Sequence, residues 1–172
     1  NDLSGSIPAS LSLLTSLTTL ILSENALKGT IPPSLSVLTA LTDLNLGDND
    51  LSGSIPASLS LLTSLTALIL SENALQGTIP SSLSKLTALR ELGFYFNHLK
   101  GTIPSSLSEL TSLTFLRLYD NDLTGTMPSS IGRWKSIEHY SVSRNNLSGT
   151  IPSEFSNWSN IKAAYFENTD LN

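Results

Sequence analysis

Side chains that could do catalytic chemistry are few in this chain of 172 residues. It has two histidines, His98 and His139, and no cysteine, which excludes thiolate nucleophiles, disulfides and thiolate metal sites. No glycine-rich phosphate-binding motif occurs, and no carboxylate pair has a spacing that suits general acid–base catalysis. We therefore predict a protein that is not an enzyme and that has no cofactor and no metal site.

Side chains that could recognise a ligand are better represented. Aromatic residues and arginines gather in the second half of the chain, and this combination is the usual anchor of a binding hot spot. A solvated surface, on which Arg and Tyr merely cover apolar neighbours, is the alternative. The candidate ligand-binding residues are Arg90, Glu91, Tyr95, Phe96, Phe115, Arg117, Tyr119, His139 and Arg144.

A 24-residue period decides where those side chains lie, because Asn, Gly and Pro all recur at it along the whole chain. The stretch 1–18 also recurs verbatim at 49–66, two periods later. Three residue types locked to one period predict a solenoid. We expect residues 1–172 to form a single array of about seven repeats.

Apolar spacing within one repeat predicts two extended segments and a helical return. Leu17–Leu22 has the pattern L-x-x-L-x-L, which ends in the alternation of a strand. Ile7, between a glycine and a proline, suits a second short strand. From Pro8 to Leu17 the leucines lie three apart, which suits a 3₁₀ or ragged helical turn. One such unit is too small to bury its apolar side chains alone, so neighbouring units must stack.

One asparagine column is predicted to be structural. Where the chain turns inward after the strand, backbone groups lose water, and an inward Asn amide can donate to and accept from them. We expect each amide to pair with its own coil and with the next. This ladder consists of Asn25, Asn49, Asn73, Asn97, Asn121 and Asn145, with Asn1 in phase.

Outward positions on the strand form columns across the coils, because successive strands lie about 5 Å apart. The first three coils are bland and acidic at these positions, whereas the candidate residues fill them later in the chain. Gly93 lacks a side chain and is expected to leave a pit between Ile69 and Arg117. In the first coil the positions are Thr18, Thr19, Ile21, Ser23 and Glu24.

Charge divides the chain in the same way. Residues 1–84 hold one base and six acids, whereas residues 85–172 hold eight of each, so the net charge of −5 belongs to the first half. An acidic chain is a poor partner for phosphate backbones, so nucleic acid is not expected. No run of apolar residues is long enough to predict a membrane span in this segment.

The unit L-x-x-L-x-L-x-x-N-x-L, continued as L-[ST]-G-[ST]-[IM]-P, resembles the plant-type leucine-rich repeat. The segments LSGSIP, KGTIP, LTGTMP and LSGTIP carry the resemblance over the whole chain. The repeats are similar to those of plant receptor-like kinase ectodomains and to those of polygalacturonase-inhibiting proteins. The resemblance implies an α/β solenoid, a right-handed superhelix with a parallel sheet on its concave face and short second strands and 3₁₀ or helical returns on the convex side. It further implies an extracellular scaffold, secreted or at the cell surface, that binds a protein or peptide, with a glycan as the other ligand class.

The ends depart from the family pattern. Plant ectodomains of this type carry paired-cysteine caps, and this chain has no cysteine. The chain starts on Asn1 and stops at Leu171–Asn172, so we expect uncapped ends that expose core leucines. A longer array, ends covered by a partner, or a family member from outside land plants that lacks the caps would explain them. The alternative function is therefore a structural element that self-associates end to end.

A hydroxyl line suggests a third function, ice binding, because repeated Thr on a flat solenoid can match an ice lattice and some plant antifreeze proteins resemble this repeat. Hydroxyls that satisfy local backbone groups are the other explanation. The line consists of Ser6, Thr30, Ser54, Thr78, Thr102, Thr126 and Thr150.

Two sequons, Asn146-Leu-Ser and Asn157-Trp-Ser, make Asn146 and Asn157 candidate glycosylation sites and agree with secretion. Close to these sequons in the chain, the predicted core residues change from leucine to aromatic side chains. Trp134, Tyr140 and Trp158 replace leucines of the repeat, and we interpret them as packing adjustments.

Overall fold

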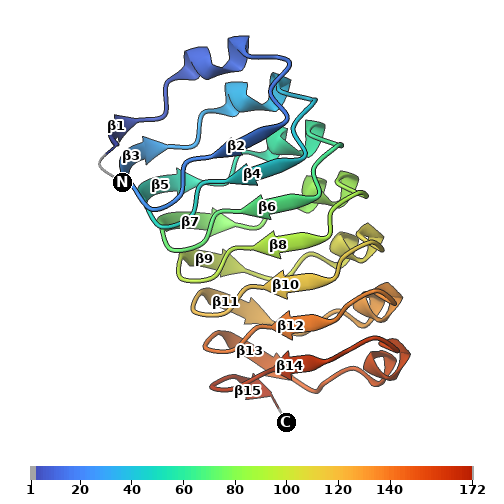
Figure 1. Cartoon of the computed structure of the whole chain (residues 1–172). Helices are drawn as coiled ribbons and strands as arrows, with labels where there is room; N and C mark the ends of the chain where they lie inside the picture. The colour runs from blue at the N-terminus through green and yellow to red at the C-terminus, as the bar shows by residue number, and fades with distance from the viewer. Residues whose placement is uncertain (1–2, 172) are drawn as a thin grey trace.

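A computed structural model describes residues 3–171 (Figure 1). The backbone winds into coils that stack in chain order, so the two ends of the chain lie at opposite ends of the stack. Asn1, the first member of the predicted ladder, and Asn172 lie outside the described residues.

Short strands, one from each coil, form the concave sheet. They run parallel in chain order, and each residue faces the equivalent residue of the next coil, as Leu20 faces Leu44. The middle position of most strands is buried while its neighbours face outward, which is the alternation that the leucine spacing predicts. The strands are β2 (Thr19–Ile21), β4 (Asp43–Asn45), β6 (Ala67–Ile69), β8 (Glu91–Gly93), β10 (Phe115–Arg117), β12 (His139–Ser141) and β14 (Ala163–Tyr165).

A second parallel sheet follows the turn of each coil. The sequence predicts only short extended pieces here, but β3 has five residues where β2 has three, so this side is a continuous sheet in its own right. Its strands are β1 (Ser4–Ser6), β3 (Ala26–Thr30), β5 (Asp50–Ser54), β7 (Ala74–Thr78), β9 (His98–Gly101), β11 (Asp122–Gly125), β13 (Asn146–Gly149) and β15 (Asp170–Leu171).

Every return to the next coil is a short 3₁₀ helix, as the three-residue leucine spacing predicts. A proline with its φ preset precedes each helix, from −73° at Pro8 to −59° at Pro152. Over residues 3–171 each helix is too short to cross a membrane. The helices are η1 (Ala9–Leu13), η2 (Pro33–Val37), η3 (Ala57–Leu61), η4 (Ser81–Lys85), η5 (Ser105–Glu109), η6 (Ser129–Arg133) and η7 (Ser153–Asn157).

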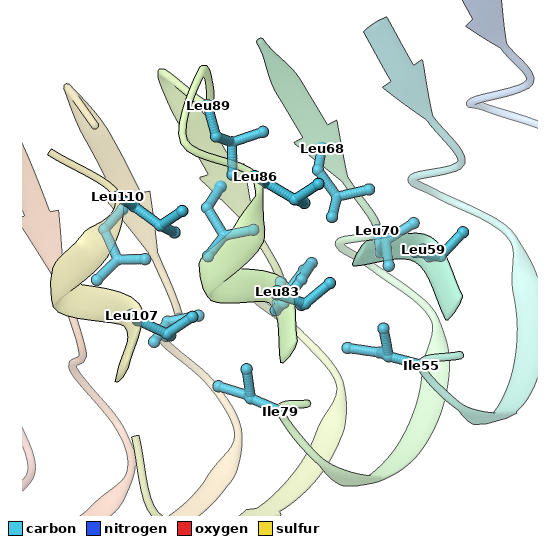
Figure 2. Packing of buried hydrophobic residues seen from close by; sticks show 14 of the residues in the cluster. Ile55, Leu59, Leu68, Leu70, Ile79, Leu83, Leu86, Leu89, Leu107 and Leu110 are labelled. Carbon is cyan, nitrogen blue, oxygen red and sulfur yellow. The ribbon is translucent and has the colours of Figure 1, made fainter. Parts of the chain in front are cut away.

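Columns of leucine fill the space between the sheets and the returns (Figure 2). Leu59, Leu83 and Leu107 occupy one position in successive coils, and all three are fully buried. Burial depends on both neighbouring coils, because Leu14 in the first coil is 50% exposed and its equivalent Leu38 is 0% exposed. Each coil is therefore stabilised mainly by the coils on either side of it.

Aromatic residues take over the core near the last coils and also tie those coils together. The indole N–H of Trp134 donates to the Leu107 carbonyl and that of Trp158 to the Ile131 carbonyl, each at 3.0 Å. Tyr140 is fully buried, its hydroxyl donates to the Met127 sulfur at 3.5 Å, and burial raises the pKa of its phenol. The packing role predicted for these residues is confirmed, with hydrogen bonds added to it.

Candidate functional site

The asparagine ladder is present, but each amide pairs with its own coil and the preceding one. Asn49 Nδ2 donates to the Leu46 carbonyl of its own coil at 3.2 Å and to the Leu22 carbonyl of the coil before at 3.0 Å. Its Oδ1 accepts the Leu27 N–H at 3.0 Å. The expected pairing with the next coil is wrong, because the amides reach back: the Leu22 carbonyl accepts from Asn25 of its own coil and from Asn49 of the following coil.

Two hydroxyl columns are structural in the same manner. Thr42 Oγ1 donates to the Thr18 carbonyl at 3.0 Å, and Thr66 repeats this bond to Thr42 at 3.1 Å. On the returns, Ser82 and Ser106 donate to carbonyls of the preceding helix. Where a coil has threonine just before its concave strand, the side chain of this residue therefore joins the coil to the preceding one.

The hydroxyl line on the second sheet behaves differently. Its members are exposed, and none of their hydroxyls makes a hydrogen bond within residues 3–171. The Thr102 methyl instead packs over Gly125, where an added Cβ would lie 2.8 Å from it. Gly125 has a φ of +79°, which favours glycine in any case. The prediction that these hydroxyls satisfy nearby backbone is therefore wrong.

Four candidate residues meet on the concave strands β8, β10 and β12. The Arg117 guanidinium forms an ion pair with Glu91 of the preceding strand. It also lies over the Phe115 ring, with its Cζ 5.1 Å from the ring centroid. Phe115 stacks on His139 of the following strand, with centroids 4.9 Å apart and planes 7° from parallel. Register therefore joins side chains that lie 24 or more residues apart in the chain.

A second aromatic group lies where the strands end. Tyr95 and Tyr119 stack with centroids 4.7 Å apart, and Phe96 meets Tyr119 edge-on at 5.5 Å. Phe96 stands in the column of Glu24 and Asp120, whose members share a left-handed backbone, with φ of 51° at Phe96. Bulky residues are uncommon in that region.

Two hollows connect these groups. A narrow one of about 130 Å³ lies between Arg117, Tyr119, His139 and Tyr165, over Ser141. A wider one of about 390 Å³ continues to Phe96, Asp120 and Arg144, where Arg144 pairs with Asp120 at 3.3 Å. Burial, and then Tyr95, raise the pKa of the Tyr119 phenol above its ordinary value of 10.0. Its protonated hydroxyl can donate to a ligand.

Three further predictions from the sequence concern Arg90, the pit at Gly93 and the two glycosylation sites. Arg90 is exposed and makes no ion pair within the described residues, so it stays outside the group. The pit expected at Gly93 is wrong, because Ile69 Cδ1 and Ser71 Oγ lie 3.1 and 3.2 Å from where its Cβ would be. Asn146 begins β13 and Asn157 ends η7, and both are exposed.

Sequence reasoning missed several residues that line the hollows, among them Asp120, Ser141 and Tyr165. Each stands in a column with a chosen candidate: Asp120 with Phe96 and Arg144, Ser141 and Tyr165 with Arg117. The column positions could have found them, since Tyr165 is an exposed aromatic residue one coil beyond the chosen range.

Stacked 24-residue coils, a parallel concave sheet and an asparagine ladder define a leucine-rich-repeat solenoid. The chain belongs to the leucine-rich-repeat family, because a family model described as leucine rich repeat matches residues 15–75 and 63–123. A second model of the same description matches residues 141–158. No curated protein matches the chain.

Solved leucine-rich-repeat structures are similar to this chain over nearly its whole length. The ectodomain of the plant membrane receptor kinase GASSHO1/SCHENGEN3 from Arabidopsis thaliana, in complex with CASPARIAN STRIP INTEGRITY FACTOR 2, is 35% identical with a TM-score of 0.98, over 99% of this chain and 20% of that one. The Arabidopsis receptor kinase HAESA, with the peptide hormone IDA and the co-receptor SERK1, is 33% identical with a TM-score of 0.94, over 98% and 28%.

A bacterial structure is similar as well. A leucine-rich-repeat protein of Leptospira interrogans is 30% identical with a TM-score of 0.85, over 97% of this chain and 41% of that one. The chain thus spans less than half the length of each of these three proteins.

Proposed function

We propose that the chain is a non-catalytic, extracellular recognition scaffold that binds a peptide or protein segment across strands β8 to β14 of its concave face. The observation that carries this proposal is the pair of stacked ring systems, Tyr95 on Tyr119 and Phe115 on His139, on either side of the hollow at Arg117. Part-exposed aromatic rings beside an arginine are typical anchors of an interface.

Chemistry of the hollow favours a polypeptide. Ser141, Tyr119 and Tyr165 offer hydroxyls, and His139 and Arg117 offer N–H donors, while the ring faces offer apolar contact. A peptide main chain supplies carbonyl acceptors and side chains together. The similar receptor kinase HAESA was solved with a peptide hormone, which supports the same ligand class. The similar GASSHO1/SCHENGEN3 structure is an ectodomain of a membrane receptor, which supports the extracellular location.

A library of random linear peptides displayed on phage tests the proposal. Peptides selected on the wild-type chain are measured on a variant with Tyr95→Ser, Arg117→Asn and Tyr119→Ser, which places at each position a residue found at the same position in another coil. We expect at least about thirtyfold weaker binding, since loss of one hot spot costs about 2 kcal/mol or more.

The matched control is Thr19→Ala with Ile21→Ala on β2, which changes the concave face of the first coil alone. Selected peptides that bind the two variants and the wild type equally would overturn the proposal. Thermal unfolding of each variant confirms that the fold is intact.

The other functions that the sequence suggests, ice binding, glycan binding and end-to-end assembly, remain predictions. Ice binding has one observation in its favour, the line of free hydroxyls, although Lys28 and Lys100 stand beside it on the same sheet. Glycan binding and end-to-end assembly have no comparable observation in their favour.

A further inference from the structure

Phe96 lies on the turn edge, the rim of the solenoid between the concave sheet and the second sheet. One side of its ring packs edge-on against Tyr95 and Tyr119, with centroids 6.0 and 5.5 Å away. The residue is nevertheless 45% exposed. Three hollows of the surface meet at it, the one shared with Tyr119 and two more on the rim.

The two rim hollows are acidic. Asp50 and Glu72 line the hollow of about 510 Å³ on the side of the earlier coils, and neither forms an ion pair within residues 3–171. Asp120 and Asp122 line the hollow of about 400 Å³ on the other side, with His98 and with Arg144, which is paired to Asp120.

This ring has no cation of its own. Over the described residues the cation placed above an aromatic ring is Arg117, and it lies on Phe115. The negative potential nevertheless reaches the aromatic group, because the Glu72 and Asp120 carboxylates both contribute to the raised pKa of Tyr119, after burial and Tyr95 and against Arg117. An exposed ring beside the unpaired carboxylates of Asp50 and Glu72 is complementary to a basic side chain with an apolar stem.

We propose that the turn edge around Phe96 is a second docking surface, which takes an arginine or lysine side chain of a polypeptide partner. The stem packs on the exposed ring, and the charged head lies between Glu72 and Asp50. The inference rests on the proposed function for the partner's main contact, but docking of the side chain can be measured without it.

N-acetylarginine N-methylamide is the probe, and N-acetylcitrulline N-methylamide is its neutral isostere. Backbone amide shifts around Asn73, Phe96 and His98 should move and saturate with the arginine probe. We expect the citrulline probe to bind up to about fivefold more weakly than the arginine probe. This is the change in affinity that corresponds to a cation–π contact at an exposed site.

Two variants separate docking on the ring from diffuse attraction. Phe96→Glu places on the turn edge the residue that Glu24 and Glu72 supply in other coils, so the fold should tolerate it. It adds a negative charge, so attraction by charge alone predicts tighter binding, whereas loss of the ring predicts binding about two- to fivefold weaker. Glu72→Gln should weaken binding of the arginine probe. Glu24 stands at the equivalent position in another coil but has no aromatic neighbour, so Glu24→Gln should leave binding unchanged.

Binding that survives or improves in Phe96→Glu would overturn the inference, and so would equal losses in Glu72→Gln and Glu24→Gln. A concave variant with Phe115→Thr, Arg117→Asn and His139→Ala distinguishes this failure from that of the proposed function, because it leaves in place Phe96 and the two tyrosines that pack against it. It should keep the shifts with the arginine probe at Glu72 and His98 while weakening the binding of the selected peptides.

Discussion

Tyr95 and Tyr119 stack with only 6° between their ring planes, although 24 residues separate them in the chain. Their positions are equivalent in successive coils, and the register of β8 with β10 brings the two rings to stacking distance. Phe115 and His139 repeat the arrangement one coil further on. The concave face of this solenoid therefore presents aromatic rings in ordered stacks, which is a rigid surface for a ligand.

Removal of one ladder amide should destabilise the array strongly. Asn97 is 6% exposed, accepts the Leu75 N–H and donates to the Leu70 and Phe94 carbonyls. Asn97→Ala leaves the buried Leu75 N–H without a partner and removes one of the two amide bonds to each carbonyl, which keep Asn73 and Asn121 as donors. We therefore expect a loss of about 2–3 kcal/mol in the free energy of unfolding by urea.

Asn25→Ala is the matched control for that experiment. Asn25 bonds to its own coil and to the Leu3 N–H, but it has no carbonyl of a preceding coil to fill and is partly exposed. Its loss should be about 1 kcal/mol. Equal losses at the two positions would show that burial between coils does not decide the contribution of the ladder.

Glycine substitutions should reveal the contact between Thr and Gly of neighbouring coils. Gly125 and Gly77 have nearly the same φ, +79° and +82°, so alanine strains both backbones alike. A Cβ at Gly125 would lie 2.8 Å from the Thr102 methyl, whereas one at Gly77 would lie 3.5 Å from Ser54 Cβ. We expect Gly125→Ala to cost about 1–2 kcal/mol more than Gly77→Ala.

Thr102→Ser checks the cause of that difference. The serine removes the methyl group, so it should recover most of the extra loss when combined with Gly125→Ala. Chemical denaturation of the four variants measures this, and no recovery would place the extra strain elsewhere.

Much of the fold could be predicted because one period governs it. The 24-residue repeat places both sheets, the returns and the ladder, since equivalent residues must stack. The period does not say which neighbour an amide will reach, so the direction of the Asn49 bonds was predicted wrongly. Nor does it show that Ile69 fills the space beside Gly93, because that depends on the length of one side chain in the neighbouring coil.

The candidate site was predictable to a similar degree. Columns identify the residues that share the concave face, but ion pairs such as Arg117 with Glu91 depend on side-chain conformations. The same limit applies to hydroxyls: Thr42 donates to the preceding coil whereas Thr78 does not, although both stand in columns where threonine recurs from coil to coil.

Stability should fall above pH 10 because of Tyr140. Burial raises the pKa of this phenol above its ordinary value of 10.0, so the unfolded chain loses the proton first as the pH rises. The unfolded state then binds fewer protons than the folded one, and the free energy of unfolding decreases with pH. No such change from Tyr140 is expected below pH 10.

Tyr140→Phe removes this titration while keeping the buried ring. Its free energy of unfolding should fall less steeply than that of the wild type between pH 10 and pH 11.5, as measured by urea denaturation. Parallel curves for the two proteins would contradict a buried, protonated Tyr140.

Single cysteines can test whether a peptide occupies the hollow at Arg117, because the chain has no cysteine of its own. Ser141→Cys places a thiol in the hollow, and Asn45→Cys places one in the same column on β4. Alkylation by a maleimide is followed with and without a saturating selected peptide. We predict that the peptide slows the reaction at position 141 and leaves position 45 unchanged; equal rates at position 141 with and without peptide would contradict the account.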